Sequence, residues 1–113
     1  MKNKILSLSK NEDFKSLLSG KKYSNKYLTI FYKKIPDKNC KKLNIGFVAK
    51  KKIGNAVKRN KIKRRLKNIM NDAVRNINLN LNYSYLFIAK ETILNEKYDK
   101  IKQQIFVELK SIK

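Results

Sequence analysis

The most regular feature of the chain is a run of apolar residues at helical spacing. Positions i, i+4, i+7 and i+11 are held by Ile62, Leu66, Ile69 and Ala73. This spacing places them on one face of an α-helix. Asn55 precedes the run and is of a type that caps helix N-termini. The pattern predicts a helix that begins at Asn55, buries one face and displays the others.

Two shorter helices are also predicted. Ser9 and Glu12 have the spacing of a capping box, and Gly20 provides a stop signal. The apolar residues of this first helix are Phe14, Leu17 and Leu18. Asn95 is expected to cap a last helix, whose buried face carries Tyr98, Ile101, Ile105, Leu109 and Ile112.

Three segments read as β-strands, namely residues 26–33, 43–50 and 85–90, because they are rich in β-branched and aromatic types. Alternation in the first strand sends Leu28, Ile30 and Tyr32 to one side, and Tyr27, Thr29 and Phe31 to the other. In the second strand, one face carries Leu43, Ile45, Phe47 and Ala49. A turn is expected at residues 36–39, and the Asn-rich residues 76–83 are read as a connection.

This order of elements predicts an α+β fold, a single α-β-β-α-β-α sandwich with helices packed on one sheet. The chain has 113 residues, which suits one modest core, so residues 1–113 are expected to form a single domain. We find no internal repeat and no linker. The longest apolar runs are much shorter than the roughly 20 residues that cross a bilayer. No secretion signal is recognisable at the N-terminus, so we expect a mature cytoplasmic protein.

Charge adds the first functional information. With 29 Lys and Arg against 8 Asp and Glu, the net charge is +21. The high net charge could have a non-functional origin in codon bias toward Lys, but the same bias would enrich Glu as well. So high a charge destabilises a small compact domain unless a polyanion is bound. Nucleic acid is the first candidate partner, and an anionic membrane surface is the second.

The same composition argues against independent catalysis. The chain has no His, and Cys40 is its single Cys, which excludes an internal disulfide and, in practice, a zinc site. A phosphate-binding loop would need more than the lone Gly54. The acidic pair Glu12–Asp13 suits a helix N-terminus better than metal chemistry. We expect no catalytic residue and no metal bound by the polypeptide alone.

The basic residues of the long helix fall on two flanks. One flank carries Asn60, Lys63, Arg64 and Lys67, and the other carries Lys58, Lys61 and Arg65. The run Lys50, Lys51 and Lys52 extends the patch before the helix. Tyr27 and Phe31 are expected beside it as a stacking surface for single-stranded nucleic acid. Burial of Phe31 under a helix is an equally good reading, whereas a merely solvated basic face is less favoured.

Several motifs of the chain resemble those of a known family. Residues 51–66, KKIGNAVKRNKIKRRL, are similar to the signature of the bacterial ribonuclease P protein subunit. Three further segments of the chain also resemble motifs of this family, namely Asn11–Phe14, Ile45–Phe47 and Tyr85–Ala89. The resemblance covers nearly the whole chain. Two positions depart from the family pattern: Lys61 stands where Arg is common, and Leu18 stands where a second aromatic is frequent.

The resemblance implies a fold and a function. It implies a ribosomal protein S5 domain 2-like sandwich with a left-handed β-α-β crossover, against the usual right-handed preference. The family's protein joins a catalytic RNA that removes the 5′ leader from precursor tRNA, with Mg²⁺ bound mainly by the RNA and no protein partner required. By position, the arginine-rich motif would comprise Arg59, Asn60, Lys61, Arg64 and Lys67. The leader cleft would be lined by Phe14 and Phe31, with Lys50, Lys51 and Lys52 near its rim.

Two other classes of protein remain as alternatives. The first is a structural ribosomal or nucleoid-type protein that binds folded nucleic acid without assisting catalysis. The second is a basic amphipathic protein of a membrane surface. The second is poor, because the sheet needs the apolar stripe of the long helix for its core.

Overall fold

The computed structural model describes residues 5–7, 11–34, 42–77, 79 and 81–112. The strands are β1 (Ile5–Ser7), β2 (Lys21–Ser24), β3 (Leu28–Lys34), β4 (Leu43–Val48) and β5 (Tyr83–Ala89). The α-helices are α1 (Asn11–Leu18), α2 (Ala56–Asn76) and α3 (Tyr98–Ser111), and two 3₁₀ helices are η1 (Lys51–Ile53) and η2 (Glu91–Asn95). The expected Ser9 cap, the turn at residues 36–39 and Cys40 lie outside the described residues.

The five strands form one mixed sheet in the order β1-β4-β5-β3-β2. β4 runs parallel to both β1 and β5, whereas β3 is antiparallel to β5 and β2. β4, α2 and β5 therefore make a β-α-β unit between neighbouring parallel strands. An α+β sandwich is confirmed.

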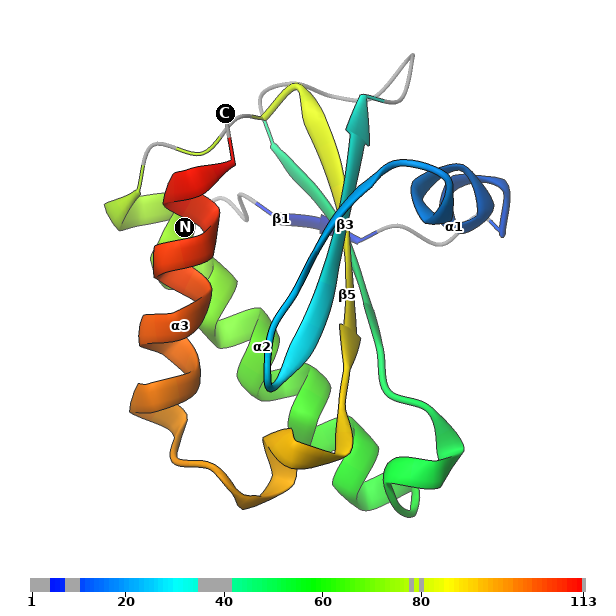
Figure 1. Ribbon diagram of the computed structural model, residues 1–113, viewed down its shortest axis with the longest axis vertical. Coiled ribbons are helices and arrows are strands. Elements are labelled where there is room, and N and C mark those ends of the chain that lie inside the picture. The colour runs from blue at the N-terminus through cyan, green and yellow to red at the C-terminus, as the bar shows by residue number, and fades with distance from the viewer. Residues whose placement is uncertain (1–4, 8–10, 35–41, 78, 80, 113) are drawn as a thin grey trace.

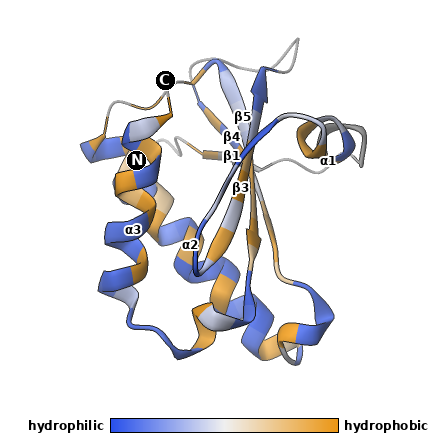
Figure 2. Ribbon diagram, viewed as in Figure 1, coloured by the Kyte–Doolittle hydropathy of each residue, from blue (hydrophilic) through white to orange (hydrophobic). Residues whose placement is uncertain are grey.

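Helices cover the two faces of the sheet unequally (Figure 1). α2 and α3 lie on one face, and their apolar stripes meet the sheet there (Figure 2). The short α1 lies on the other face, where Leu17 packs on Leu86 in a second, smaller cluster. The main core includes the predicted stripe of Ile62, Leu66, Ile69 and Ala73, together with Ile101, Ile105 and Leu109 of α3. The helices thus cover most of one face of the sheet and a smaller part of the other.

The start of α2 follows the sequence prediction. The Asn55 side chain accepts a hydrogen bond from the Lys58 backbone N–H at 3.0 Å. This bond satisfies one of the donors that a helix N-terminus leaves unpaired. With the cap and the buried stripe both in place, α2 holds its remaining faces in a fixed orientation.

Three features differ from the sequence-based expectations. β1 and β2 were missed because they are only 3 and 4 residues long, and the side chains of β2 are mostly exposed, so no apolar alternation marks them. β5 begins at Tyr83, inside the expected connection. Asn95 does not cap the last helix: it ends η2, and the N-cap of α3 is Lys97.

Tyr27 was also placed on the wrong face. It precedes β3 in a turn where the Asn25 side chain accepts hydrogen bonds from the backbone N–H groups of Tyr27 and Leu28. The turn breaks the strand alternation, so the Tyr27 ring packs into the main core and its side chain is only 8% exposed. Its hydroxyl donates to Glu96 at 2.9 Å, and this bond, with burial, raises the pKa of Tyr27. Tyr27 is therefore a core residue, away from the face of Phe31.

Candidate RNA interface

The first part of α2 displays a dense group of cations. Its basic side chains are Lys58, Arg59, Lys61, Lys63, Arg64, Arg65 and Lys67. Five of them are exposed, whereas Arg59 and Arg65 are half-buried. Within the described part of the chain, none of these seven side chains makes a hydrogen bond or an ion pair. The charges are thus available to an outside partner.

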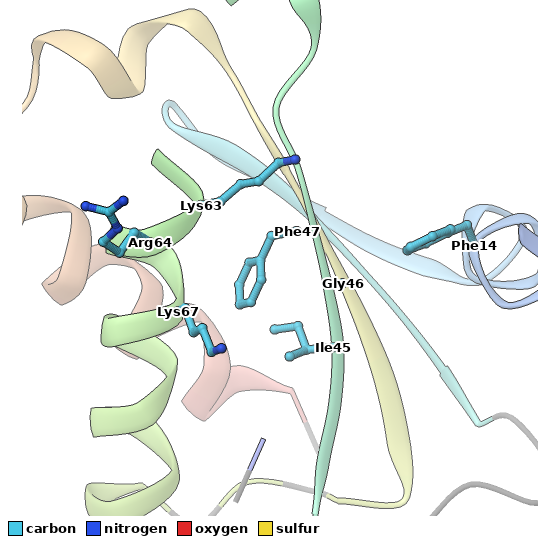
Figure 3. Close-up of a pocket in the computed structure, with 7 residues that line it drawn as sticks. All are labelled: Phe14, Ile45, Gly46, Phe47, Lys63, Arg64 and Lys67. Atoms are coloured by element: carbon cyan, nitrogen blue, oxygen red, sulfur yellow. The ribbon is translucent and has the colours of Figure 1, made fainter. Parts of the chain in front are cut away.

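One flank of α2 borders a cleft (Figure 3). A hollow of about 340 Å³ lies between this flank, the β4 strand and α1. Its lining residues are Phe14, Ile45, Gly46, Phe47, Lys63, Arg64 and Lys67. Figure 3 shows Ile45 and Phe47 pointing from β4 toward α2, with Phe14 across the strand. The cleft therefore joins an aromatic, apolar floor to a cationic wall.

The geometry of β4 makes room for the cleft. Among the described residues, β1 pairs only with the segment Leu43–Ile45, so beyond Ile45 this edge of β4 has no strand partner. Gly46 permits the close approach of Phe14, because a Cβ atom at residue 46 would lie 2.6 Å from Phe14 Cε1. A side chain at Gly46 would push the ring away. The glycine in the Ile45–Phe47 motif thus positions the Phe14 ring.

Phe31 lies on the same sheet face as Phe14, in the small cluster under α1. It is half-buried there and packs against the cluster formed by Leu17 and Leu86. Part of the Phe31 ring therefore packs under α1, as one of the two sequence-based readings expected. It does not line the cleft of Phe14, although part of its surface remains accessible.

The second flank of α2 faces a separate hollow of about 310 Å³. This hollow is lined by Lys58, Lys61, Ile62, Arg65, Leu94 and Asn95. The prediction of two distinct basic flanks is confirmed, since no residue lines both hollows. Asn60 is exposed on α2 and lines neither hollow.

The three lysines before α2 do not all line the same hollow. Lys50 and Lys52 line a hollow of about 420 Å³ at the end of β5, whereas Lys51 is exposed outside it. Lys90 also lines this hollow, and its Nζ donates to the Ser24 hydroxyl at 2.7 Å and the Asn25 carbonyl at 2.6 Å. Sequence reasoning missed Lys90, which stands alone at the end of a strand without a basic run around it. Strand pairing brings it beside Lys50 and Lys52.

The donor set of the cleft does not suit a metal ion. Its charged lining groups are Lys63, Arg64 and Lys67, and cations repel a divalent cation. Among the residues that the structure describes, no group of three or more His, Cys, Asp or Glu side chains could hold a metal. In the same described segments, no helix is long and apolar enough to cross a membrane.

The fold and this arrangement of cations and rings define a small α+β nucleic-acid-binding protein. Comparison with known proteins narrows the class, because the Ribonuclease P family matches residues 2–113. The chain belongs to the ribonuclease P protein family.

Relatives and solved structures agree with this assignment. The ribonuclease P protein component of Carboxydothermus hydrogenoformans is 32% identical, over 98% of this chain and 94% of the relative. That of Mycoplasma mycoides subsp. mycoides is 31% identical over 100% of both chains. The structure of the ribonuclease P protein from Thermotoga maritima has the same fold, with a TM-score of 0.79 at 22% identity over 96% of this chain and 98% of that one.

Proposed function

We propose that this chain acts in ribonuclease P by binding the single-stranded 5′ leader of precursor tRNA in its cleft, while the other flank of α2 contacts the catalytic RNA. As a ribonuclease P protein, the chain is part of an endoribonuclease complex. The finer assignment of surfaces is our inference. A cytoplasmic location, where precursor tRNA is processed, belongs to the same proposal.

The observation that carries the leader assignment is the composition of the cleft. A single strand needs a ring on which a base can stack and cations that follow its phosphates. Phe14 offers the ring on one side of β4, while Lys63, Arg64 and Lys67 offer the cations on the other. Lys50, Lys52 and Lys90 continue the positive surface along the sheet, and Lys51 adds a charge nearby. A duplex could not present its bases to such a cleft.

The second flank suits a folded RNA. Lys58, Lys61 and Arg65 lie beside Asn95, whose amide can both donate and accept hydrogen bonds. Arg59 lines neither hollow, and its buried Nε has no hydrogen-bond partner within the described chain. An unpaired buried donor costs about 1–3 kcal/mol, which a phosphate oxygen would offset. These features support contact with the catalytic RNA through charge-assisted hydrogen bonds.

In this proposal the hydrolysis itself belongs to the RNA. Mg²⁺ bound by the RNA would supply the Lewis acid and the activated water for phosphodiester cleavage. The protein's cations reduce the repulsion between leader, catalytic RNA and metal-binding phosphates. The protein therefore lowers the concentration of Mg²⁺ that cleavage requires and provides no reacting group.

Cleavage of a precursor tRNA by bacterial ribonuclease P RNA at low Mg²⁺ tests the subunit role. We expect the protein to restore leader removal, and the double substitution Arg59→Gln with Arg64→Gln to abolish that effect. A matched control replaces two exposed lysines of α3, Lys100→Gln with Lys110→Gln, and should retain full stimulation. Binding without any change in rate or Mg²⁺ requirement would favour the structural nucleic-acid-binding alternative.

The cleft assignment has its own test. Phe14→Leu removes the ring but keeps an apolar side chain, so the holoenzyme should bind precursor tRNA about fivefold or more weakly, equivalent to one lost stacked base. Mature tRNA has no leader, so its affinity should not change. Phe106→Leu on α3 is the control. Equal losses for precursor and mature tRNA would contradict a leader cleft.

A further inference from the structure

A further basic surface, which also carries aromatic rings, lies where β3 ends, at the tip of its arrow in Figure 1. A hollow of about 330 Å³ is formed there by the end of β3, the start of β5 and the turn after α1. Its lining residues are Ser19, Gly20, Lys21, Tyr32, Lys33, Lys34 and Tyr83. None of these residues belongs to the two flanks of α2 or to the cleft of Phe14.

Tyrosine rings give this hollow an ordered aromatic wall. Tyr32 stacks on Tyr23, with centroids 6.2 Å apart and planes 18° apart. Tyr83 meets Tyr32 edge to face at 5.3 Å, and Tyr85 closes the group from beneath within the core. Tyr23, Tyr32 and Tyr83 are each only half-buried. The wall is therefore held by ring-to-ring packing while part of its surface stays accessible.

The charges around the hollow are all positive. Lys21 and Lys34 are exposed, and Lys33 Nζ donates to the Ser19 hydroxyl at 3.3 Å. No carboxylate is among the lining residues. Lysine beside a partly accessible tyrosine matches the needs of a nucleotide, which presents one phosphate and one base to stack.

The strand register separates this hollow from the lysine-rich hollow at the other end of the sheet. Leu28 of β3 pairs with Ala89, which lines that hollow, whereas Lys34 pairs with Tyr83 at this one. Six residue steps along a strand span about 20 Å. One nucleotide cannot occupy both hollows, so the two surfaces are separate contacts.

We propose that the hollow between Tyr32, Tyr83, Lys21 and Lys34 is an additional binding site for single-stranded RNA. An unpaired base contacts the tyrosine wall, and the neighbouring phosphates are neutralised by the lysines. The RNA comes from one of two sources that share this chemistry, the leader upstream of the cleft or an unpaired segment of the catalytic RNA. Only the identity of these two sources rests on the proposed function.

The experiment compares two charge-matched double variants in the assembled ribonucleoprotein. Lys21→Gln with Lys34→Gln alters the hollow at exposed positions, where the fold is not at risk. Lys100→Gln with Lys110→Gln removes the same charge from α3 and serves as control. Affinity is measured for the catalytic RNA alone, for a precursor with a short leader and for precursors with progressively longer leaders.

We expect the hollow variant to lose affinity about threefold to tenfold relative to the control, in one of the RNA arms. Its log affinity should also fall less steeply with log salt, by about 0.7 for each phosphate of a single strand that the variant no longer neutralises. A loss confined to long leaders assigns the hollow to upstream leader. A loss for the catalytic RNA itself assigns it there.

A second variant tests the aromatic part. Tyr83→Leu removes a ring without changing charge and should weaken the same RNA arm, with an unchanged salt slope, while circular dichroism verifies that the fold is retained. If neither variant differs from the α3 control in any arm, the additional site is refuted. The short-leader precursor remains sensitive to Phe14→Leu in that case, so failure of this site is distinguishable from failure of the leader cleft.

Discussion

The first part of α2 and the region around α3 use charge in opposite ways. On α2, seven basic side chains have no partner within the described residues. Around α3, three acids are engaged: Asp72 accepts from Lys102 at 2.9 Å, Glu108 accepts from Asn25 at 2.6 Å, and Glu96 accepts from Tyr27. Both helices bury a regular apolar stripe, so the difference lies in their polar faces.

This difference separates stability from binding. The ion pair between Lys102 and Asp72 and satisfied hydrogen bonds hold the α3 side together without any outside partner, whereas unpaired cations on α2 repel one another. The α2 side is therefore incomplete until an anion is bound. Substitutions on the two sides should act on different measurable quantities, and their expected effects differ in size.

The largest effect should come from the core under α3. Ile105 is fully buried, so Ile105→Ala removes packed methyl groups and leaves a cavity. We expect a loss of about 2–5 kcal/mol in the free energy of unfolding, measured by urea titration. Val107 on the same helix is 62% exposed, so Val107→Ala should change stability by less than about 0.5 kcal/mol. Similar losses for both variants would mean that α3 does not pack as described.

The turn at Asn25 should come next. Its side chain accepts from two backbone N–H groups and donates to Glu108. Asn25→Ala leaves these groups without partners, so we expect a loss of about 1–3 kcal/mol in the free energy of unfolding. Glu108→Gln retains an acceptor oxygen and should cost less. The salt slope of RNA binding should be unchanged in both variants, and a shallower slope would show that the two regions are not independent.

Neutralising the cleft wall should have the opposite effect, because RNA binding should weaken while the stability of the fold is retained. For Arg64→Gln with Lys67→Gln we expect affinity for a single-stranded RNA to fall about tenfold at low salt, with the salt slope shallower by about 1.4 because two phosphates are no longer neutralised. Stability should stay equal or rise, since self-repulsion decreases. Fluorescence anisotropy and urea titration measure the two quantities. A marked loss of stability would contradict the view that these cations play no part in folding.

The smallest effect concerns pH. Hydrogen bonds from the Lys97 backbone N–H and the Tyr27 hydroxyl lower the pKa of Glu96. A lowered folded-state pKa means that this contribution is present above the ordinary value of 4.5 and is lost as the pH falls below it. Glu96→Gln cannot titrate, so its stability should decline less on acidification. Parallel urea titrations down to about pH 3 would reveal the difference, and identical profiles would exclude a role for Glu96.

The long helix and its two flanks could be predicted from the sequence because they depend on local periodicity. Asn55 caps α2 and the apolar stripe is buried, as local patterns indicate. Tyr27 could not be placed, because its backbone N–H donates to the Asn25 side chain, and this bond shifts the strand start and changes the face of Tyr27. β1 has only three residues and depends on pairing with β4, an interaction that leaves no local signal.

The cleft was predicted only through the family resemblance. Phe14 meets the β4 edge because Gly46 lacks a side chain, and the two residues are far apart in the sequence. The grouping of Lys90 with Lys50 and Lys52 likewise arises from parallel pairing of β4 and β5. Such sites depend on register, which periodicity in one segment does not specify.

The bond between Asn25 and Glu108 also affects the order in which the protein becomes complete during translation. Its two partners are 83 residues apart, so the first is synthesised long before the second. At about 5–20 residues per second, the ribosome takes about 4–17 s to add the intervening residues. The basic helix α2 is synthesised within that interval, while the turn at Asn25 still lacks its partner. The nascent chain thus carries its basic helix before α3 is available to complete the domain.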